Sequence, residues 1–210
     1  MIVYAESNFT LELAFLQEEA ELCEKIAKLA ESQHVELVLP AFSGSEPYER
    51  MVRRAKDRKA LNEGLASEIK ELARSSPYSN IDDTARSLTA ILSQSASEEK
   101  IRLDHTLLRL TKISRMIPLT SEVLRLSIQY QGDFALSPQD AIVFASVISD
   151  LQKIKKEDQK LFVTRNKGDF LNPDISDLLS TYSCKLLFTF ENAVGYVRSI
   201  IGSASTDPVP

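Results

Sequence analysis

The stretch that decides the fold is MIVYAESNFT LELAFLQEEA ELCEKIAKLA ESQHVELVLP, residues 1–40. Met1 to Tyr4 form a short apolar run followed by polar residues, the pattern of a buried strand that ends at a turn. Apolar residues then recur at helical spacing from Leu11 to Ala30, and Glu36 to Leu39 predicts a second strand stopped by Pro40. A strand, a helix and a strand within this length match a right-handed βαβ crossover, which indicates a parallel sheet.

The rest of the chain continues this alternation. A long helical stretch beyond Glu46 is predicted to break in a Ser/Pro/Asn cluster at 75–80, and an edge strand is expected over 116–119, where Pro118 would be poorly tolerated in a central strand. The other predicted elements are helices over 82–95, 98–114, 120–131, 138–151, 175–180 and 190–201, and strands over 161–164 and 185–188. We therefore predict an α/β fold with a parallel sheet wrapped by helices.

The domain organisation follows from the same pattern. We expect a single domain over residues 1–201, with a helical insertion at about 50–115 and a disordered tail at 202–210. The 210-residue chain has no apolar run near the ~20 residues that span a bilayer, and Met1 to Tyr4 lack the flank of a signal peptide, so we expect a cytoplasmic protein without membrane contact. Cys23 and Cys184 lack metal-ligand spacing and are expected to be buried thiols. The isolated His34 and His105 receive no catalytic role.

The formal charge of -5 is unevenly distributed. Between Glu49 and Arg115 there are 14 Lys and Arg against 10 Asp and Glu, a local charge of +4, which leaves 11 against 20 elsewhere, a charge of -9. Such a run can be a solvated helix face, or its long cations can meet phosphates along a groove. The candidate nucleic-acid-binding residues are Arg50, Arg53, Arg54, Lys56 and Arg58, with Lys59 beside them.

Four acids are expected at one rim of the sheet. Glu6, Glu46 and Asp169 follow the ends of predicted strands, and Asp140 lies in the first turn of a helix that follows Ser137. Each has a plainer explanation: a helix start for Glu6 and Asp140, a capping box formed by Ser43 and Glu46, and an Asn/Gly/Asp turn for Asp169. Together, however, they lie where parallel sheets carry their active sites.

Clustered carboxylates repel one another, and a divalent cation is the usual remedy. Ligation by oxygen alone points to Mg²⁺ or Mn²⁺, which activate water and bridge phosphate oxygens. This chemistry favours phosphodiester hydrolysis.

At these residues the sequence resembles the PIN-domain (PilT N-terminus-like) nuclease family. The run Val3-Tyr4-Ala5-Glu6-Ser7-Asn8 resembles its first acidic motif, Leu136 to Ala145 its helix-borne Asp motif, and Val163 to Phe170 its last acidic motif. The similarity extends from Met1 to about Val197, apart from the helical segment at about 50–115. The Glu46 run, led by Pro-Ala-Phe-Ser, resembles a bacterial PIN-like subgroup.

The resemblance implies a three-layer α/β/α sandwich and a Mg²⁺- or Mn²⁺-dependent endoribonuclease acting on single-stranded RNA, with DNA as an alternative. Carried over by position, Glu6, Glu46, Asp140 and Asp169 are the catalytic metal-binding acids, and the residues that orient ligands or phosphate are Asn8, Thr164 and Asn166. The family usually has Asp at the first position, so Glu6 moves that carboxylate outward by about one methylene in a site with tolerances near ~0.5 Å.

Other functions stay open at this stage. The chain can be a PIN fold that no longer cuts and binds RNA or protein, or the toxin of a toxin–antitoxin pair with an antitoxin-like partner. A homodimer is also compatible with the resemblance. A phosphatase or nucleotide hydrolase is disfavoured because the sequence has no Walker-type glycine loop and no Asp-x-Asp run after the first strand.

Overall fold

The computed structural model describes residues 1–78, 82–155 and 157–204. The strands among these residues form one parallel sheet. The strand order is β3-β2-β1-β4-β5. In register, Val3 of β1 lies opposite Leu37 of β2 on one side and Leu161 of β4 on the other. The strands are β1 (Ile2–Ala5), β2 (Glu36–Pro40), β3 (Ser114–Ile117), β4 (Lys160–Val163) and β5 (Cys184–Leu187).

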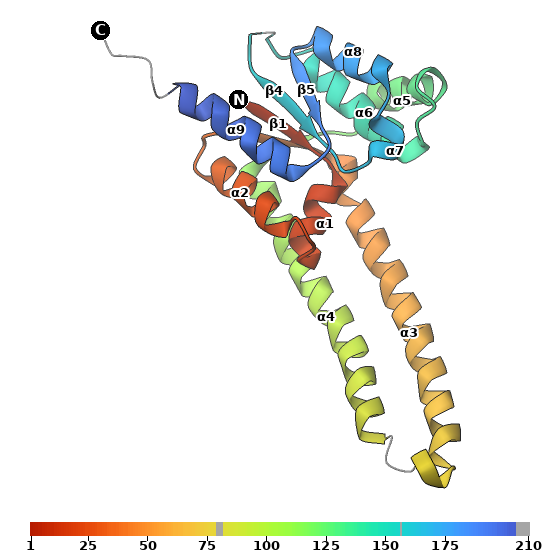
Figure 1. Cartoon of the computed structure of the whole chain (residues 1–210). Coiled ribbons are helices and arrows are strands. Elements are labelled where there is room, and N and C mark those ends of the chain that lie inside the picture. The colour runs from red at the N-terminus through yellow and green to blue at the C-terminus, as the bar shows by residue number, and fades with distance from the viewer. Residues whose placement is uncertain (79–81, 156, 205–210) are drawn as a thin grey trace.

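Helices cover both faces of this sheet, which gives the three-layer α/β/α arrangement that was expected (Figure 1). Alternate residues of β1 point to opposite faces, so that Ile2 and Tyr4 join one core while Val3 and Ala5 join the other. On the Tyr4 side lie α5 (Ser121–Asp133), α6 (Pro138–Leu151) and α8 (Pro173–Thr181). On the Val3 side lie α1 (Ser7–Phe15), α2 (Ala20–Glu31) and α9 (Phe190–Ala204).

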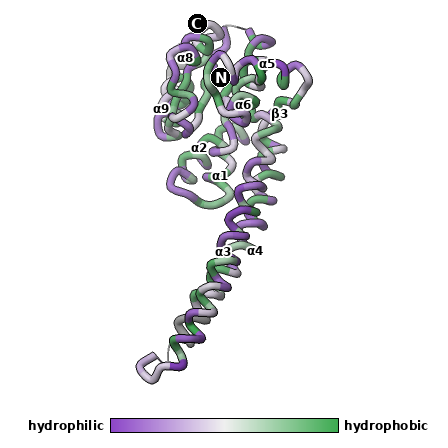
Figure 2. Tube along the Cα trace, turned by 90° about the vertical axis from the view of Figure 1, so that its right-hand side faces the viewer, coloured by the Kyte–Doolittle hydropathy of each residue, from purple (hydrophilic) through white to green (hydrophobic). Residues whose placement is uncertain are grey.

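A long helical hairpin leaves this sandwich between β2 and β3. A short 3-10 helix, η1 (Ala41–Gly44), leads from β2 into α3 (Glu46–Ala73), and the chain returns through α4 (Asp82–Ile113), with η2 (Ser76–Tyr78) near the tip. The 28 residues of α3 span about 42 Å. Both views show the outer part of the hairpin projecting away from the sheet and its flanking helices (Figures 1 and 2).

The first helix prediction was wrong in its boundaries. The segment predicted as one helix over 11–30 is two helices that begin at Ser7 and Ala20. The chain breaks at Leu16, which has a left-handed backbone (φ 50°) and donates its N–H to the carbonyl of Glu12. The buried Glu12 side chain then accepts a hydrogen bond from the backbone N–H of Glu19 at 2.8 Å, which stabilises the turn. The apolar spacing predicted one continuous helix because α1 and α2 both bury an apolar face, and their apolar residues together mimic a single helical pattern.

Other boundaries also differ from the prediction. The helices predicted over 82–95 and 98–114 are the single helix α4, and the edge strand is Ser114–Ile117 because its pairing with β2 ends at Ile117, before Pro118. A short helix, α7 (Lys167–Phe170), replaces the turn expected after β4. Residues 202–204 of the expected tail belong to α9, and 205–210 lie outside the described residues, as do residues 79 and 80 of the predicted turn cluster.

The expectations about the cysteines and about membrane-spanning segments can be compared directly with the structure. Cys23 and Cys184 are both buried free thiols, as predicted. Within residues 1–78, 82–155 and 157–204, none of the helices combines the length and apolar character required to cross a bilayer.

Candidate active site

The ends of β1, β2 and β4 surround a polar cleft of about 380 Å³. Glu6 follows β1 directly, and Glu46 reaches the cleft as the first residue of α3 after η1. Asp140 enters from the first turn of α6. The lining residues are Glu6, Ser7, Asn8, Glu46, Gln139, Asp140, Val143, Arg165 and Asn166. Three of the four predicted acids therefore line one cleft, at the carboxyl ends of the strands, where parallel sheets carry their sites.

Glu6 is buried and held by several donors. It is the N-cap of α1, and its carboxylate accepts hydrogen bonds from the Ser7 hydroxyl at 2.7 Å and from the backbone N–H of Asn8 at 3.2 Å. The side-chain amide of Asn8 and the hydroxyl of Thr164, at 3.0 Å, donate to its other oxygen. Burial raises the pKa of Glu6 above its ordinary range, while these hydrogen bonds oppose the rise. Asn8 and Thr164, predicted as orienting residues, thus both contact the first acid.

Asp140 and Asp169 are joined by Asn166. The amide nitrogen of Asn166 donates to Asp140 Oδ1 at 3.0 Å and to Asp169 Oδ2 at 2.6 Å. The backbone N–H of Asn166 donates in turn to the Thr164 hydroxyl at 2.9 Å, so one chain of contacts links Glu6 to both aspartates. Burial raises the pKa of Asp140, and the negative charge of Asp169 raises it further. Asp169, which does not line the cleft itself, joins the site through this amide.

The capping box expected for Glu46 does not form. Ser45, not Ser43, is the N-cap of α3, and the Ser45 hydroxyl donates to the carbonyl of Phe42 at 2.7 Å. The Ser43 hydroxyl, within η1, is buried without a hydrogen-bond partner among the described residues. The Glu46 carboxylate is therefore left to line the cleft rather than to close the helix.

The donors fit a hard divalent cation in kind. They are carboxylate oxygens, the ligands that Mg²⁺ and Mn²⁺ prefer. Burial raises the pKa of Asp140, and the nearby charge of Asp169 adds to this rise. In the described part of the chain, however, no three Asp, Glu, His or Cys side chains stand close enough together to form a complete metal site. At present the Asn166 amide lies between two of the carboxylates and relieves part of their repulsion.

Comparison with known protein families identifies the chain. The family model described as PIN domain matches residues 3–170, which include all four acids. The chain belongs to the PIN domain family. PIN domains are generally nucleases that bind RNA or DNA and usually use divalent metals. Searches of curated proteins and of solved structures found no match to this chain.

Some lining residues of this PIN domain site, Arg165 among them, were not predicted from the sequence. Arg165, directly after β4, lines the cleft and forms ion pairs with the buried Glu12 and with Glu19 at 3.3 Å. Two signals could have revealed the pair: a cation directly beyond a buried strand, and an acid in the otherwise apolar run of α1. Ser137 also contributes more than the helix cap predicted for it, since its hydroxyl donates to Asp140 Oδ2 at 2.5 Å.

The five candidate nucleic-acid-binding cations do not form one surface. Arg54 and Arg58 point toward α4, where the buried Glu99 pairs with them at 3.1 and 2.7 Å, and the Arg54 guanidinium also stacks on the Phe15 ring. Arg50 lies one helical turn beyond Glu46 and therefore on the side of α3 that faces the cleft. The two remaining cations, Arg53 and Lys56, are exposed.

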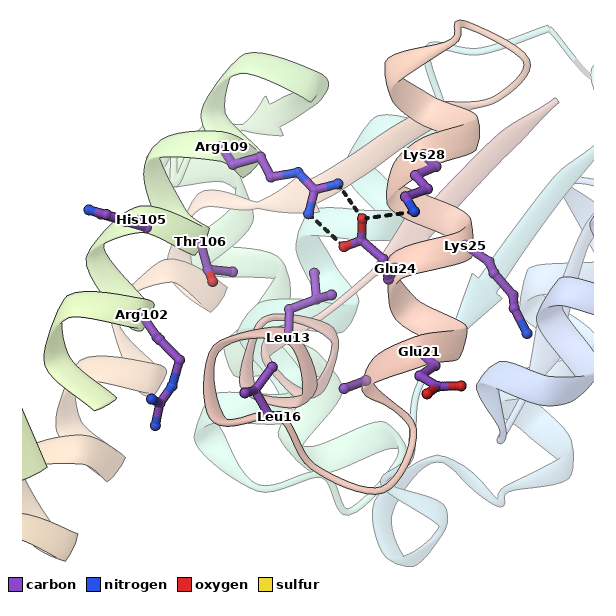
Figure 3. A pocket seen from close by; sticks show the side chains of 11 residues that line it. Leu13, Leu16, Glu21, Glu24, Lys25, Lys28, Arg102, His105, Thr106 and Arg109 are labelled. Carbon is purple, nitrogen blue, oxygen red and sulfur yellow. Dashed lines mark hydrogen bonds and ion pairs between the residues drawn. The ribbon is translucent and has the colours of Figure 1, made fainter. Parts of the chain in front are cut away.

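A larger pocket of about 640 Å³ lies elsewhere, between the α1–α2 turn and α4 (Figure 3). Leu13 and Leu16 provide apolar walls, and Arg109 binds Glu24 with two hydrogen bonds of 2.6 and 2.9 Å. Lys28 also pairs with Glu24, at 3.9 Å. Four cations line this pocket against two acids, and Arg109 and Lys28 neutralise Glu24. We therefore take the smaller cleft that holds Glu6, Glu46 and Asp140 as the candidate active site.

Proposed function

We propose that this PIN domain is a Mg²⁺- or Mn²⁺-dependent endoribonuclease that hydrolyses phosphodiester bonds in single-stranded RNA. The observation that carries the proposal is the chain of contacts from Glu6 through Thr164 and Asn166 to Asp140 and Asp169, beside Glu46. Family membership supports the reaction class. The cytoplasmic location and the single-domain organisation stay predictions.

Each residue of the cleft has a proposed part. Asp140 and Asp169 would hold the cation together with Glu6, and Glu46 would complete its surroundings. When bound, such an ion supplies a nucleophilic water and neutralises charge on the phosphate. Thr164 and Asn166 fix the angles of the acids through their hydrogen bonds. These supporting contacts matter because a carboxylate displaced by ~0.5 Å loses productive geometry.

The substrate strand would approach along α3. Arg50 lies one turn and Arg53 two turns beyond Glu46, so both can contact phosphates that flank the scissile bond. Arg54 and Arg58 would contribute little directly, because both already pair with the buried Glu99. The proposed RNA contact is thus narrower than the sequence suggested.

Cleavage of labelled single-stranded RNA and DNA tests the proposal. We expect cutting with Mg²⁺ or Mn²⁺, loss of activity in EDTA, and a fall of at least about 100-fold in Asp140→Asn. Asp174→Asn is the matched control, because Asp174 is also a first-turn acid but lies on α8, outside the cleft. Metal-dependent cutting that survives in pure Asp140→Asn protein would contradict the proposal, and a preference for DNA would correct the substrate.

One observation favours a second candidate, a PIN domain that binds RNA without cutting it. Both Glu6 carboxylate oxygens already accept hydrogen bonds from Ser7, Asn8 and Thr164, so these donors compete with a cation for the same lone pairs. If the wild type and Asp140→Asn bind RNA equally and neither cuts it with either metal, this second function replaces the first.

A further inference from the structure

The helical hairpin has an apolar row on the side where α1 covers its base. Near the base, the Arg54 guanidinium lies over Phe15 of α1, and Arg102 of α4 donates to the carbonyl of Ala14 at 3.3 Å. Arg54 and Arg102 therefore mark the α1 side of α3 and of α4. Viewed edge-on, α1 and α2 lie on one side of the hairpin base and leave its outer part uncovered (Figure 2).

The same two rows continue outward as mostly apolar residues, interrupted by the exposed Glu68 on α3 and by Ser95 on α4. Steps of three, four and seven residues keep a helix face, so on α3 the row of Arg54 leads to Leu61, Leu65 and Leu72. On α4 the row of Arg102 leads back through Ser95 to Ile91 and Leu88. Leu61 is 60% exposed, Leu72 39%, Leu88 48% and Ile91 62%. We call Leu61, Leu65, Leu72, Leu88 and Ile91 the hairpin face.

The seam between α3 and α4 is weakly packed beside this face. Asn62 and Ser93 meet at 3.4 Å across the seam, and a hollow of about 110 Å³ lies next to them. Arg58 Nη1 and Asn62 Oδ1 are buried there without a hydrogen-bond partner among the described residues. Two helices alone bury only one stripe each, and most helical stability in proteins comes from tertiary packing of an amphipathic face. The outer hairpin therefore lacks a packing layer.

We propose that the hairpin face is a self-association surface, on which a second copy of this chain packs its own hairpin face to form a four-helix bundle. A two-fold pairing needs one surface that is complementary to itself, and a two-helix face that is mostly apolar meets this condition within each chain. Glu68, which shares the row of Leu61 and Leu72, would lie at the edge of such a pairing.

The size of the surface is adequate. The part of α3 beyond Arg58 is about 22 Å long and a helix pair about 20 Å wide, which gives an outline on the order of 450 Å². Accessible area exceeds outline area because side chains form ridges, so the surface approaches the ~800 Å² per partner of a stable interface. The surface is continuous with the α1 contact on the same side, which already buries Phe15 and Leu103.

The surface is also distant from the cleft. Leu61 lies 15 residues beyond Glu46, about 22 Å along α3, so association leaves the acids accessible and does not depend on their chemistry. The inference goes beyond the proposed nuclease activity, and either can fail without the other.

Two double variants test it by light scattering with size exclusion and by sedimentation equilibrium over a range of concentrations. We expect the wild type at about twice the 23.5 kDa chain mass. Leu61→Glu with Ile91→Glu should be monomeric, with dimerisation weakened by at least about 100-fold, because charges would be buried between the copies. Leu61→Gln with Ile91→Gln serves if the first pair unfolds, as judged by circular dichroism.

The matched control uses exposed apolar residues of the same helices outside the hairpin face. Val52 is 61% exposed and Ile101 57%, and neither falls on the rows of Arg54 and Arg102. Val52→Glu with Ile101→Glu should therefore stay dimeric. A monomeric wild type would overturn the inference, and so would a Leu61/Ile91 variant that dimerises as tightly as the wild type.

Discussion

Replacing Asp140 with Asn should reverse its stability relative to the wild type when a divalent metal is added. Without metal, two effects oppose each other. Loss of a first-turn acid costs about 0.3–1 kcal/mol of interaction with the dipole of α6. Removal of the charge relieves both its burial and its repulsion from Asp169, the causes that raise the pKa of Asp140.

We expect the relief to exceed the loss by a small margin, since burial and the Asp169 charge act in the same direction. Charge pairs at partly exposed positions are worth on the order of 1 kcal/mol, so without metal the Tm of Asp140→Asn should lie at or up to roughly 3 °C above that of the wild type. The amide is isosteric with the carboxylate and can keep the contact with Ser137.

Addition of metal should invert this order. At about 100 times the dissociation constant, Mn²⁺ stabilises a folded chain by about 2.7 kcal/mol, or roughly 5–11 °C for a protein of this size. The variant, which lacks one ligand and one negative charge, should gain far less. Differential scanning fluorimetry with Mn²⁺ and with EDTA measures the four Tm values, for the wild type and for Asp140→Asn under each condition.

Asp174→Asn is the control, because it removes a first-turn acid of α8 without touching the cleft. It should lose a fraction of 1 kcal/mol and still gain the full metal shift. Asp140 would be only a helix-dipole partner if Asp140→Asn were less stable without metal and gained as much from Mn²⁺ as the wild type. That result would refute the argument from charge crowding.

Three further predictions concern the hairpin, the substrate path and pH. Glu99→Ala should lower the free energy of unfolding by about 3 kcal/mol in a denaturant titration, because it leaves Arg54 and Arg58 without their buried partner. Glu98→Ala removes an exposed ion pair and should lower the free energy of unfolding by less than about 0.5 kcal/mol. If the proposed function holds, Arg50→Gln should raise KM several-fold with little change in kcat. The same variant should reduce the salt dependence of RNA binding by roughly one charge. Lys70→Gln, near the hairpin tip, is the control and should change neither quantity. Burial raises the pKa of Glu6 in the folded chain above its usual value near 4.5. Glu6 therefore favours folding at pH values below 4.5, and this contribution to stability is lost as pH rises through the raised pKa, so the stability of Glu6→Gln should fall less than that of the wild type over this pH window. An identical pH profile for the two proteins would count against the burial argument.

The sequence alone determined the class of fold and the edge of the sheet at which the predicted acids lie. Short apolar runs alternating with helical periodicity predict a parallel sheet wrapped by helices, because strands buried on both faces must be apolar throughout. Acids directly beyond those runs then lie at the carboxyl edge of the sheet, which is why Glu6 and Asp140 could be placed at one cleft before any coordinates were known.

Local patterns were less dependable where two explanations share the same residues. The Ser43 and Glu46 spacing matches a capping box, yet η1 places Ser45 at the cap and leaves the Glu46 carboxylate in the cleft. The left-handed turn at Leu16 was likewise hidden, because apolar spacing does not record a backbone angle.

Only the tertiary structure decided which charges are available. The sequence indicated Arg54 and Arg58 as phosphate contacts. The returning helix α4, however, brings Glu99, 41 residues beyond Arg58, into ion pairs with both. In the same way, Asn166 became the link between Asp140 and Asp169 because α6 begins beside the point where β4 ends. Composition and periodicity depend on near neighbours along the chain, whereas charge pairing depends on distance in space, and that distance is set by how the elements pack.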